Sequence, residues 1–196
     1  MKKISIAVIG GSLRPQSYTM KALNIIVQEL QRHPHVVIEM IDPRDLPLSL
    51  ALPGSPSQAS FEESLKKRVS SAMGFILATP EYHGSCSSII KLIIENFGYP
   101  SVLEGKPVAL VGVADGQIGA VKALEHLQST CIHIGALVLP GAVSIAHVQN
   151  LFNAHGHCLD KDIEKRLRGL ANHLIQYVGK HISPHAAFEE TVRGKE

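Results

Sequence analysis

The sequence predicts an α/β fold: one open parallel sheet of five strands in the order 2-1-3-4-5, with helices on both faces. Two observations lead to this prediction. Short apolar runs alternate along the chain with longer segments whose apolar residues recur at helical spacing, as in repeated strand–helix units. Three of the apolar runs also end in loops that contain glycine. In such a sheet the ligand binds beyond the carboxyl ends of the strands, where the strand order reverses.

The apolar runs are rich in β-branched residues and show no polar alternation, which is typical of strands buried on both faces. Strands are therefore expected over residues 4–9, 36–41, 74–79, 106–114 and 136–145. Pro140 and Gly141 interrupt the last of them. Helices are expected over residues 20–30, 61–72, 87–95, 118–132 and 160–178. The segment 42–60 contains four prolines and is expected to be a long loop, a kind of segment that is often functional.

The composition fits one compact domain. The chain has 196 residues, 45% hydrophobic and 18% charged, with a net charge of +2 and no dense run of Lys and Arg that would indicate nucleic-acid binding. No apolar stretch is long enough to span a membrane, and the apolar run at the start of the chain lacks a cleavage site. Three cysteines without a C-x-x-C pair fit a reducing compartment. We expect a cytoplasmic protein, with one domain over residues 1–180 and a tail over 181–196.

The loop after the first strand has the chemistry of a phosphate site. Gly10 and Gly11 allow a tight turn into a helix, whose free N–H groups and positive dipole end attract anions. Four side chains add hydrogen-bond donors: Ser12, Arg14, Ser17 and Thr19. The alternative is an ordinary strand–helix turn with a serine N-cap.

Two familiar phosphate loops are excluded by the letters of the sequence. The chain has no Gly-Lys-Ser/Thr ending of a P-loop here, and it lacks the third glycine of the dinucleotide fingerprint. Side-chain hydroxyls and one arginine suit a phosphate monoester better than a pyrophosphate.

Two later loops complete the predicted site. In the segment 79–87, Pro80 fixes the backbone, Gly84 permits an unusual conformation and Tyr82 offers a face for stacking on a planar ligand. The alternative is a structural turn with a half-buried tyrosine. In the segment 113–120, Gly116 and Gly119 would let the backbone approach a flat ring. A phosphate at the first loop and a planar group across the other two describe flavin mononucleotide (FMN) better than a sugar phosphate.

The motifs G-S-L-R-x-x-S in the first loop and T-P-E-Y-x-G-S in the second resemble those of the NAD(P)H-dependent FMN reductases. That family, which includes quinone, azo-dye and chromate reductases, has the flavodoxin-like three-layer sandwich fold. The resemblance covers roughly residues 3–178. It implies FMN as cofactor, NADPH or NADH as co-substrate, a small-molecule electron acceptor and a homodimer or homotetramer. The apolar helix at 87–95 also suggests a surplus of hydrophobic surface that a second subunit would bury.

The resemblance also implies the roles of individual residues. The FMN phosphate would be held by Ser12, Arg14, Ser17 and Thr19. The isoalloxazine ring would be bordered by Pro80, Glu81, Tyr82, His83 and Gly84, and its pyrimidine side closed by Asp115 and Gly116. FMN carries the chemistry, so no side chain is expected to be catalytic. The chain departs from the family's pattern at His83, where asparagine is usual, and at Asp115, in a loop that usually carries serine or threonine.

The expected function is hydride transfer from NAD(P)H through FMN to quinones, free flavin or related acceptors, in a ping-pong order. The alternative is a flavodoxin-like electron carrier or a flavin-binding redox sensor without NAD(P)H turnover. Such carriers are commonly acidic, whereas the pI here is about 8.4.

The residues His155–Gly–His–Cys158 do not have a zinc spacing, so no metal is expected. Cys86 is interpreted as a small residue, with a reactive thiol as the alternative.

Overall fold

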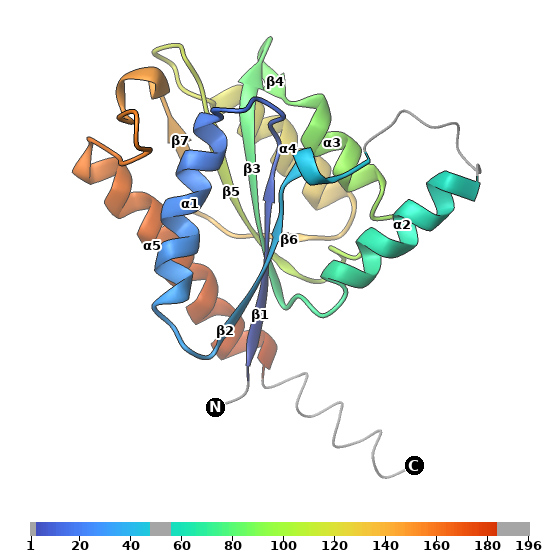
Figure 1. Ribbon diagram of the computed structural model, residues 1–196. Coiled ribbons are helices and arrows are strands. Elements are labelled where there is room, and N and C mark those ends of the chain that lie inside the picture. Colours follow the sequence, from blue (N-terminus) through green and yellow to red (C-terminus); the bar gives the residue numbers. More distant parts are fainter. Residues whose placement is uncertain (1–2, 48–55, 184–196) are drawn as a thin grey trace, which may run out of the picture.

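A parallel sheet lies between two layers of helices (Figure 1). The computed structural model describes residues 3–47 and 56–183. Each strand of the main sheet pairs in parallel with the next, in the order β2 (Val36–Ile41), β1 (Ile4–Gly10), β3 (Gly74–Tyr82), β5 (Pro107–Val113) and β6 (Leu137–Val138). The α/β class and the parallel sheet are therefore confirmed.

Two details of the sheet differ from the prediction. The fifth strand is split into β6 and β7 (Val143–Ile145), and both parts pair with β5. Pro140 and Gly141 cause the break, because proline has no N–H for the ladder and Gly141 has a φ of +90°. In addition, β3 continues to Tyr82 and turns back into β4 (Ser85–Cys86), which pairs with it in antiparallel fashion. The strand order thus holds along the main path, with β4 and β7 beside it.

Each face of the sheet has its own hydrophobic core. On one face pack α1 (Tyr18–Gln31) and α5 (Lys161–Tyr177), and on the other α2 (Pro56–Val69), α3 (Ser88–Glu95) and α4 (Val121–His133) (Figure 1). All seven residues of β5 are buried, as expected of a strand covered on both sides. Among the helices of the described segments, none combines the length and apolarity that crossing a membrane requires.

The helix boundaries shift where local signals were misread. Helix α2 begins at Pro56, five residues before the predicted start, because proline is well suited to the first helical turn. The predicted proline-rich loop is shorter as a result. It begins with a 3₁₀ turn at Pro43–Asp45, and its part at 48–55 lies outside the described residues. Of the predicted tail at 181–196, residues 184–196 also lie outside them.

A buried charge joins the two helices that support the first loop. The carboxylate of Glu29 in α1 accepts hydrogen bonds from Asn172 Nδ2 (3.0 Å) and Arg168 Nη1 (3.3 Å) of α5, and from Arg32 Nη1 (3.1 Å). The Asn172 amide, followed by the two guanidinium groups, holds the pKa of Glu29 below its ordinary value against the opposing effect of burial. Glu29 therefore stays ionised near neutral pH and fixes α1 against α5.

Candidate functional site

A cleft of about 310 Å³ lies at the carboxyl edge of the sheet. It is at the point where the strand order reverses, beyond β1 and β3, as predicted for an open parallel sheet. Three loops and one later segment supply its walls. The lining residues are Ser12, Arg14, Gln16, Ser17, Tyr18, Thr19, Pro80, Glu81, Tyr82, Val113, Ala114, Asp115 and Val148.

The structure brings most of the predicted site residues together. Those that line the cleft are Ser12, Arg14, Ser17, Thr19, Pro80, Glu81, Tyr82 and Asp115. Three predicted residues are not part of its lining: His83, Gly84 and Gly116. Sequence reasoning missed Gln16, Tyr18, Val113, Ala114 and Val148. The first four of these lie within or beside the quoted loops, whereas no local signal pointed to Val148.

One end of the cleft has the donors of an anion site. Ser17 is the N-cap of α1, and its hydroxyl accepts a hydrogen bond from Met20 N (3.3 Å). The hydroxyl of Ser12 accepts a bond from Arg14 N (3.4 Å), which holds the first loop in a compact turn. Ser12, Ser17 and Thr19 are all buried, and they line the cleft beside the positive end of the α1 dipole. This set of donors fits a phosphate group.

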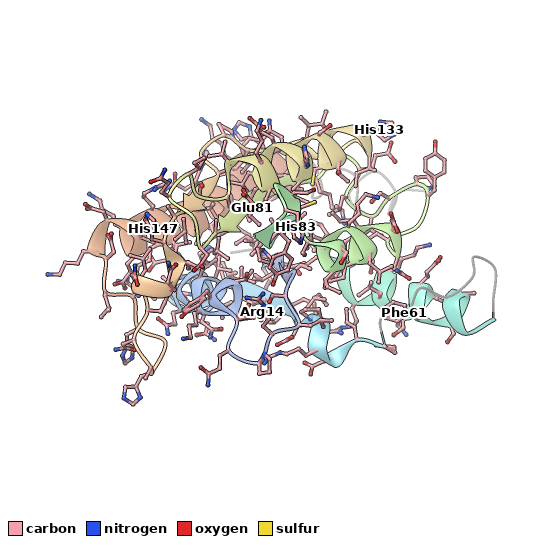
Figure 2. The ribbon with its side chains drawn as sticks, turned by 90° about the horizontal axis from the view of Figure 1, so that it is seen from above. Arg14, Phe61, Glu81, His83, His133 and His147 are labelled. Carbon is pink, nitrogen blue, oxygen red and sulfur yellow. The ribbon has the colours of Figure 1, made fainter. Side chains whose placement is uncertain are left out.

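Arg14 connects the first loop to the second. Its guanidinium carbon lies 5.2 Å from the centre of the Tyr82 ring, within range of a cation–π interaction. Figure 2 shows Arg14 on the α1 side of the site, with Glu81 and His83 on the opposite side. The side chains of Arg14 and Tyr82 thus connect the first loop, with its hydrogen-bond donors, to the β3–β4 hairpin.

The tip of that hairpin explains why two predicted residues lie outside the cleft. His83 has a φ of +50° and Gly84 a φ of +72°, the left-handed pair that a type I′ turn requires. The turn is exposed and reverses the chain from β3 into β4. His83 is therefore a turn residue, and its backbone conformation is one that asparagine and glycine adopt more readily.

His83→Asn should stabilise the protein by a few tenths to about 1 kcal/mol, because asparagine lowers the cost of a left-handed residue in the turn. Chemical denaturation of the flavin-free protein would measure the change. His83→Val should have the opposite effect, since a β-branched side chain is strained at positive φ. His155→Asn, in another exposed loop, is the control. A His83→Asn midpoint at or below that of the wild type would contradict the argument.

The base of the hairpin is tied to α4. Glu81 Oε2 accepts a hydrogen bond from Ala123 N (3.4 Å), in the first turn of a helix whose N-cap residue, Ala120, makes no side-chain bond. Ser85 Oγ lies 3.0 Å from His126 Nδ1 of the same helix. Cys86 is half-buried and packs against a small cluster of alanines that includes Ala120 and Ala123. The second and third loops are therefore held as one unit.

The end of β7 and the residues after it hold the third loop by hydrogen bonds. Ala114 N donates to Ile145 O (2.9 Å), Val148 N donates to Ala114 O (3.1 Å), and Gln149 Nε2 donates to Asp115 O (3.3 Å). This ladder brings Val148 into the wall of the cleft. Gly116 is exposed and outside the lining.

The histidine-rich loop has a structural explanation of its own. The backbone N–H groups of His155 and His157 both donate to Asn153 Oδ1, at 3.0 and 2.9 Å. A side-chain amide oxygen that binds two nearby N–H groups stabilises a local turn. Within residues 3–47 and 56–183, no group of three or more His, Cys, Asp or Glu side chains is placed to hold a metal ion.

Known proteins resemble this chain along most of its length. The sequence model of a family described as NADPH-dependent FMN reductase matches residues 4–150. An NAD(P)H-dependent FMN reductase of Pseudomonas aeruginosa is 32% identical over 164 residues, which are 80% of this chain and 85% of that protein. A 2-hydroxy-1,4-benzoquinone reductase of Burkholderia sp. is 26% identical over 84% of this chain and 91% of its own. The structure of a flavoenzyme NAD(P)H:(acceptor) oxidoreductase from Paracoccus denitrificans superposes with a TM-score of 0.71 at 26% identity, covering 91% of this chain and 98% of that one.

Proposed function

Because the chain belongs to the NADPH-dependent FMN reductase family, we propose that it binds FMN in the cleft and transfers reducing equivalents from NAD(P)H to a small-molecule acceptor. The observation that carries the proposal is the make-up of the cleft. Buried hydroxyls and a helix N-terminus lie at one end, Pro80, Ala114 and Asp115 lie at the other, and Arg14 in contact with Tyr82 lies between them. This arrangement matches a ligand with a phosphate tail and a planar head.

At the first end, the hydroxyls of Ser12, Ser17 and Thr19 and the free N–H groups of the first turn of α1 would donate to the phosphate oxygens. Arg14 would add a charged pair of donors and balance part of the negative charge. Several fixed donors that converge on one anion make this end the main source of affinity and of selectivity for a phosphate.

At the other end, Pro80, Tyr82 and Ala114 would border the ring, and the backbone around Asp115 and Gly116 would supply N–H donors to its polar edge. When bound, FMN supplies the hydride chemistry, so the protein needs no nucleophile of its own. The chain's part is to orient the ring, to hold its polar edge and to leave room for a second planar molecule. That molecule is first the nicotinamide and then the acceptor.

The acceptor we propose is a quinone, free flavin or a related planar compound. The overall balance with a quinone is NAD(P)H plus one proton plus quinone, giving NAD(P)⁺ and the hydroquinone. Relatives named benzoquinone reductase and NADPH azoreductase support a flat acceptor. Stacking would set the geometry in both half-reactions, with the nicotinamide and with the acceptor. Few polar contacts would select one acceptor over another, so a broad acceptor range is expected.

If nicotinamide and acceptor use the same side of the cleft in turn, the kinetics must be ping-pong. Steady-state rates with NADPH or NADH, varied against quinones, free flavin, azo dyes and ferric chelates, should give parallel lines in double-reciprocal plots. Intersecting lines would contradict the order. Failure of NADPH and NADH to bleach the flavin without oxygen would favour an electron carrier or redox sensor instead.

We also propose that the chain forms a homodimer or homotetramer. In α3, Ile90, Ile93 and Ile94 are buried within the chain, whereas Ile89 and Leu92 are only half-buried. More strongly exposed apolar side chains lie outside α3, with Tyr99 98% exposed, Ile118 76% and Ile132 56%. Sedimentation at micromolar concentration should show a dimer or larger species, and Tyr99→Ser with Ile132→Ser should shift it toward monomer. A wild-type monomer would contradict the proposal.

A cytoplasmic location remains our proposal as well. All three cysteines, Cys86, Cys131 and Cys158, are free in the structure. Burial raises the pKa of the Cys131 thiol to about 12, so this thiol stays protonated and unreactive near neutral pH. Unpaired cysteines are the usual condition in a reducing compartment.

A further inference from the structure

Two buried hydroxyls link the first and second loops beneath the cleft. Thr79, near the end of β3, is 0% exposed, and Ser87, the N-cap of α3, is 1% exposed. Ser87 N donates to Thr79 Oγ1 (2.9 Å), which in turn donates to Pro80 O (2.9 Å). Ser87 Oγ donates to Gly11 O (2.6 Å) and accepts from Ile90 N (3.2 Å). A continuous set of hydrogen bonds thus runs from Pro80 to Gly11.

This linkage connects residues that belong to opposite ends of the cleft. Gly11 directly precedes Ser12, whose hydroxyl lines the anion-binding end, and Pro80 lines the other end. The contact is close, because a Cβ on Gly11 would lie 2.9 Å from both Ser87 Oγ and Ala78 O. Hydrogen bonds in a buried setting hold their geometry more firmly than exposed ones. The hydrogen bonds of Ser87 therefore hold the first loop beside the second, just beyond the β1–β3 pairing that ends at Gly10 and Ala78.

We propose that Ser87 is a positioning residue, which fixes the first loop at the distance from Pro80 that lets one FMN molecule reach both ends of the cleft. The proposal rests on the proposed function. Ser87 itself is not part of the cleft lining, so it would act through Gly11. Without its hydroxyl the buried carbonyl of Gly11 loses its donor, and the phosphate site loses part of its preorganisation.

The loss should be specific for the phosphate-bearing ligand. Riboflavin has the same ring as FMN but no phosphate, so it does not use the first loop. In the flavin-free protein, Ser87→Ala should raise the Kd for FMN about 5- to 30-fold, while the Kd for riboflavin changes little. Quenching of flavin fluorescence measures both constants.

Two variants make the test specific to the Ser87 hydroxyl. Ser87→Thr keeps a hydroxyl and should restore most of the FMN affinity. Ser88→Ala is the matched control, since Ser88 is the next residue, exposed in the first turn of α3, and should leave both constants unchanged. Thermal denaturation of each variant reports whether it is folded. If Ser87→Ala does not fold, Thr79→Val tests the same linkage from its other hydroxyl, with the same FMN-selective loss expected.

The outcomes separate this inference from the proposed function. An FMN-selective loss with rescue by threonine supports the positioning role. An unchanged FMN affinity, or an equal loss for FMN and riboflavin, overturns it and leaves the proposed function standing. A wild-type protein that binds no FMN overturns the proposed function and this inference together.

Discussion

Arg14→Ala should weaken FMN binding by about 1.5–3 kcal/mol, or roughly 10- to 150-fold in Kd. Arg14 lines the anion-binding end of the cleft, where it is the one guanidinium among the lining residues. In the proposed complex with FMN, removing it takes away a charged hydrogen-bonding partner of the phosphate. It also removes the cation–π contact with Tyr82, so the ring end loses a support as well.

Titration of the flavin-free protein with FMN would measure the loss. Arg14→Lys should fall between the wild type and Arg14→Ala, because lysine keeps the charge but not the paired donors. Arg166→Ala, at an exposed position of α5, removes the same charge away from the site and is the control. The purified wild type should be yellow with non-covalent FMN. An unchanged Kd, or FAD as the retained flavin, would contradict the assignment.

Gly11→Ala should destabilise the protein by about 1–3 kcal/mol and reduce the FMN content of the purified protein. The added Cβ would lie 2.9 Å from Ala78 O and from Ile90 Cβ, and neither atom is the end of a flexible side chain. The first loop must therefore move away from β3 and α3. A displaced loop no longer presents Ser12 to the cleft, so stability and binding fall together.

The loop glycine Gly116 provides the comparison. No atom lies within 4 Å of the position a Cβ would take there, so Gly116→Ala should leave the free energy of unfolding nearly unchanged. Urea denaturation of the two flavin-free variants beside the wild type is the measurement. Equal midpoints for Gly11→Ala and Gly116→Ala would contradict the prediction, because they would mean that the packing around Gly11 accommodates a methyl group.

The sheet and most of the site could be predicted because their signals are local. Buried parallel strands are continuous apolar runs, and the five predicted ones fall on β1, β2, β3, β5 and the β6–β7 pair. In the first loop, glycines and hydroxyl residues stand within a few positions of each other, so Ser12, Arg14, Ser17 and Thr19 were found together. That these residues bind FMN stays a prediction.

The features of the site that the sequence did not predict depend mostly on contacts between distant parts of the chain. Val148 joins the cleft wall because its N–H bonds to Ala114, thirty-four positions earlier, and a sequence pattern carries no trace of that pairing. The hairpin at His83 was missed because a histidine in a left-handed turn is uncommon, although His-Gly at that place follows the same turn geometry as Asn-Gly. The short linkage through Ser87 likewise depends on how close β1 and α3 come in space.

The carboxylate of Glu81, at the start of α4, makes the electrostatic potential differ between the two sides of the cleft. A helix N-terminus carries roughly half a positive charge, and two of them, those of α1 and α4, lie beside the cleft. The end of α1 is left open to a ligand. At the end of α4, Glu81 places a full negative charge, which more than cancels the local dipole. A dianionic tail is thus drawn toward α1 and repelled from the side of α4, so the field alone favours one of the two ways in which a long ligand could lie in the cleft.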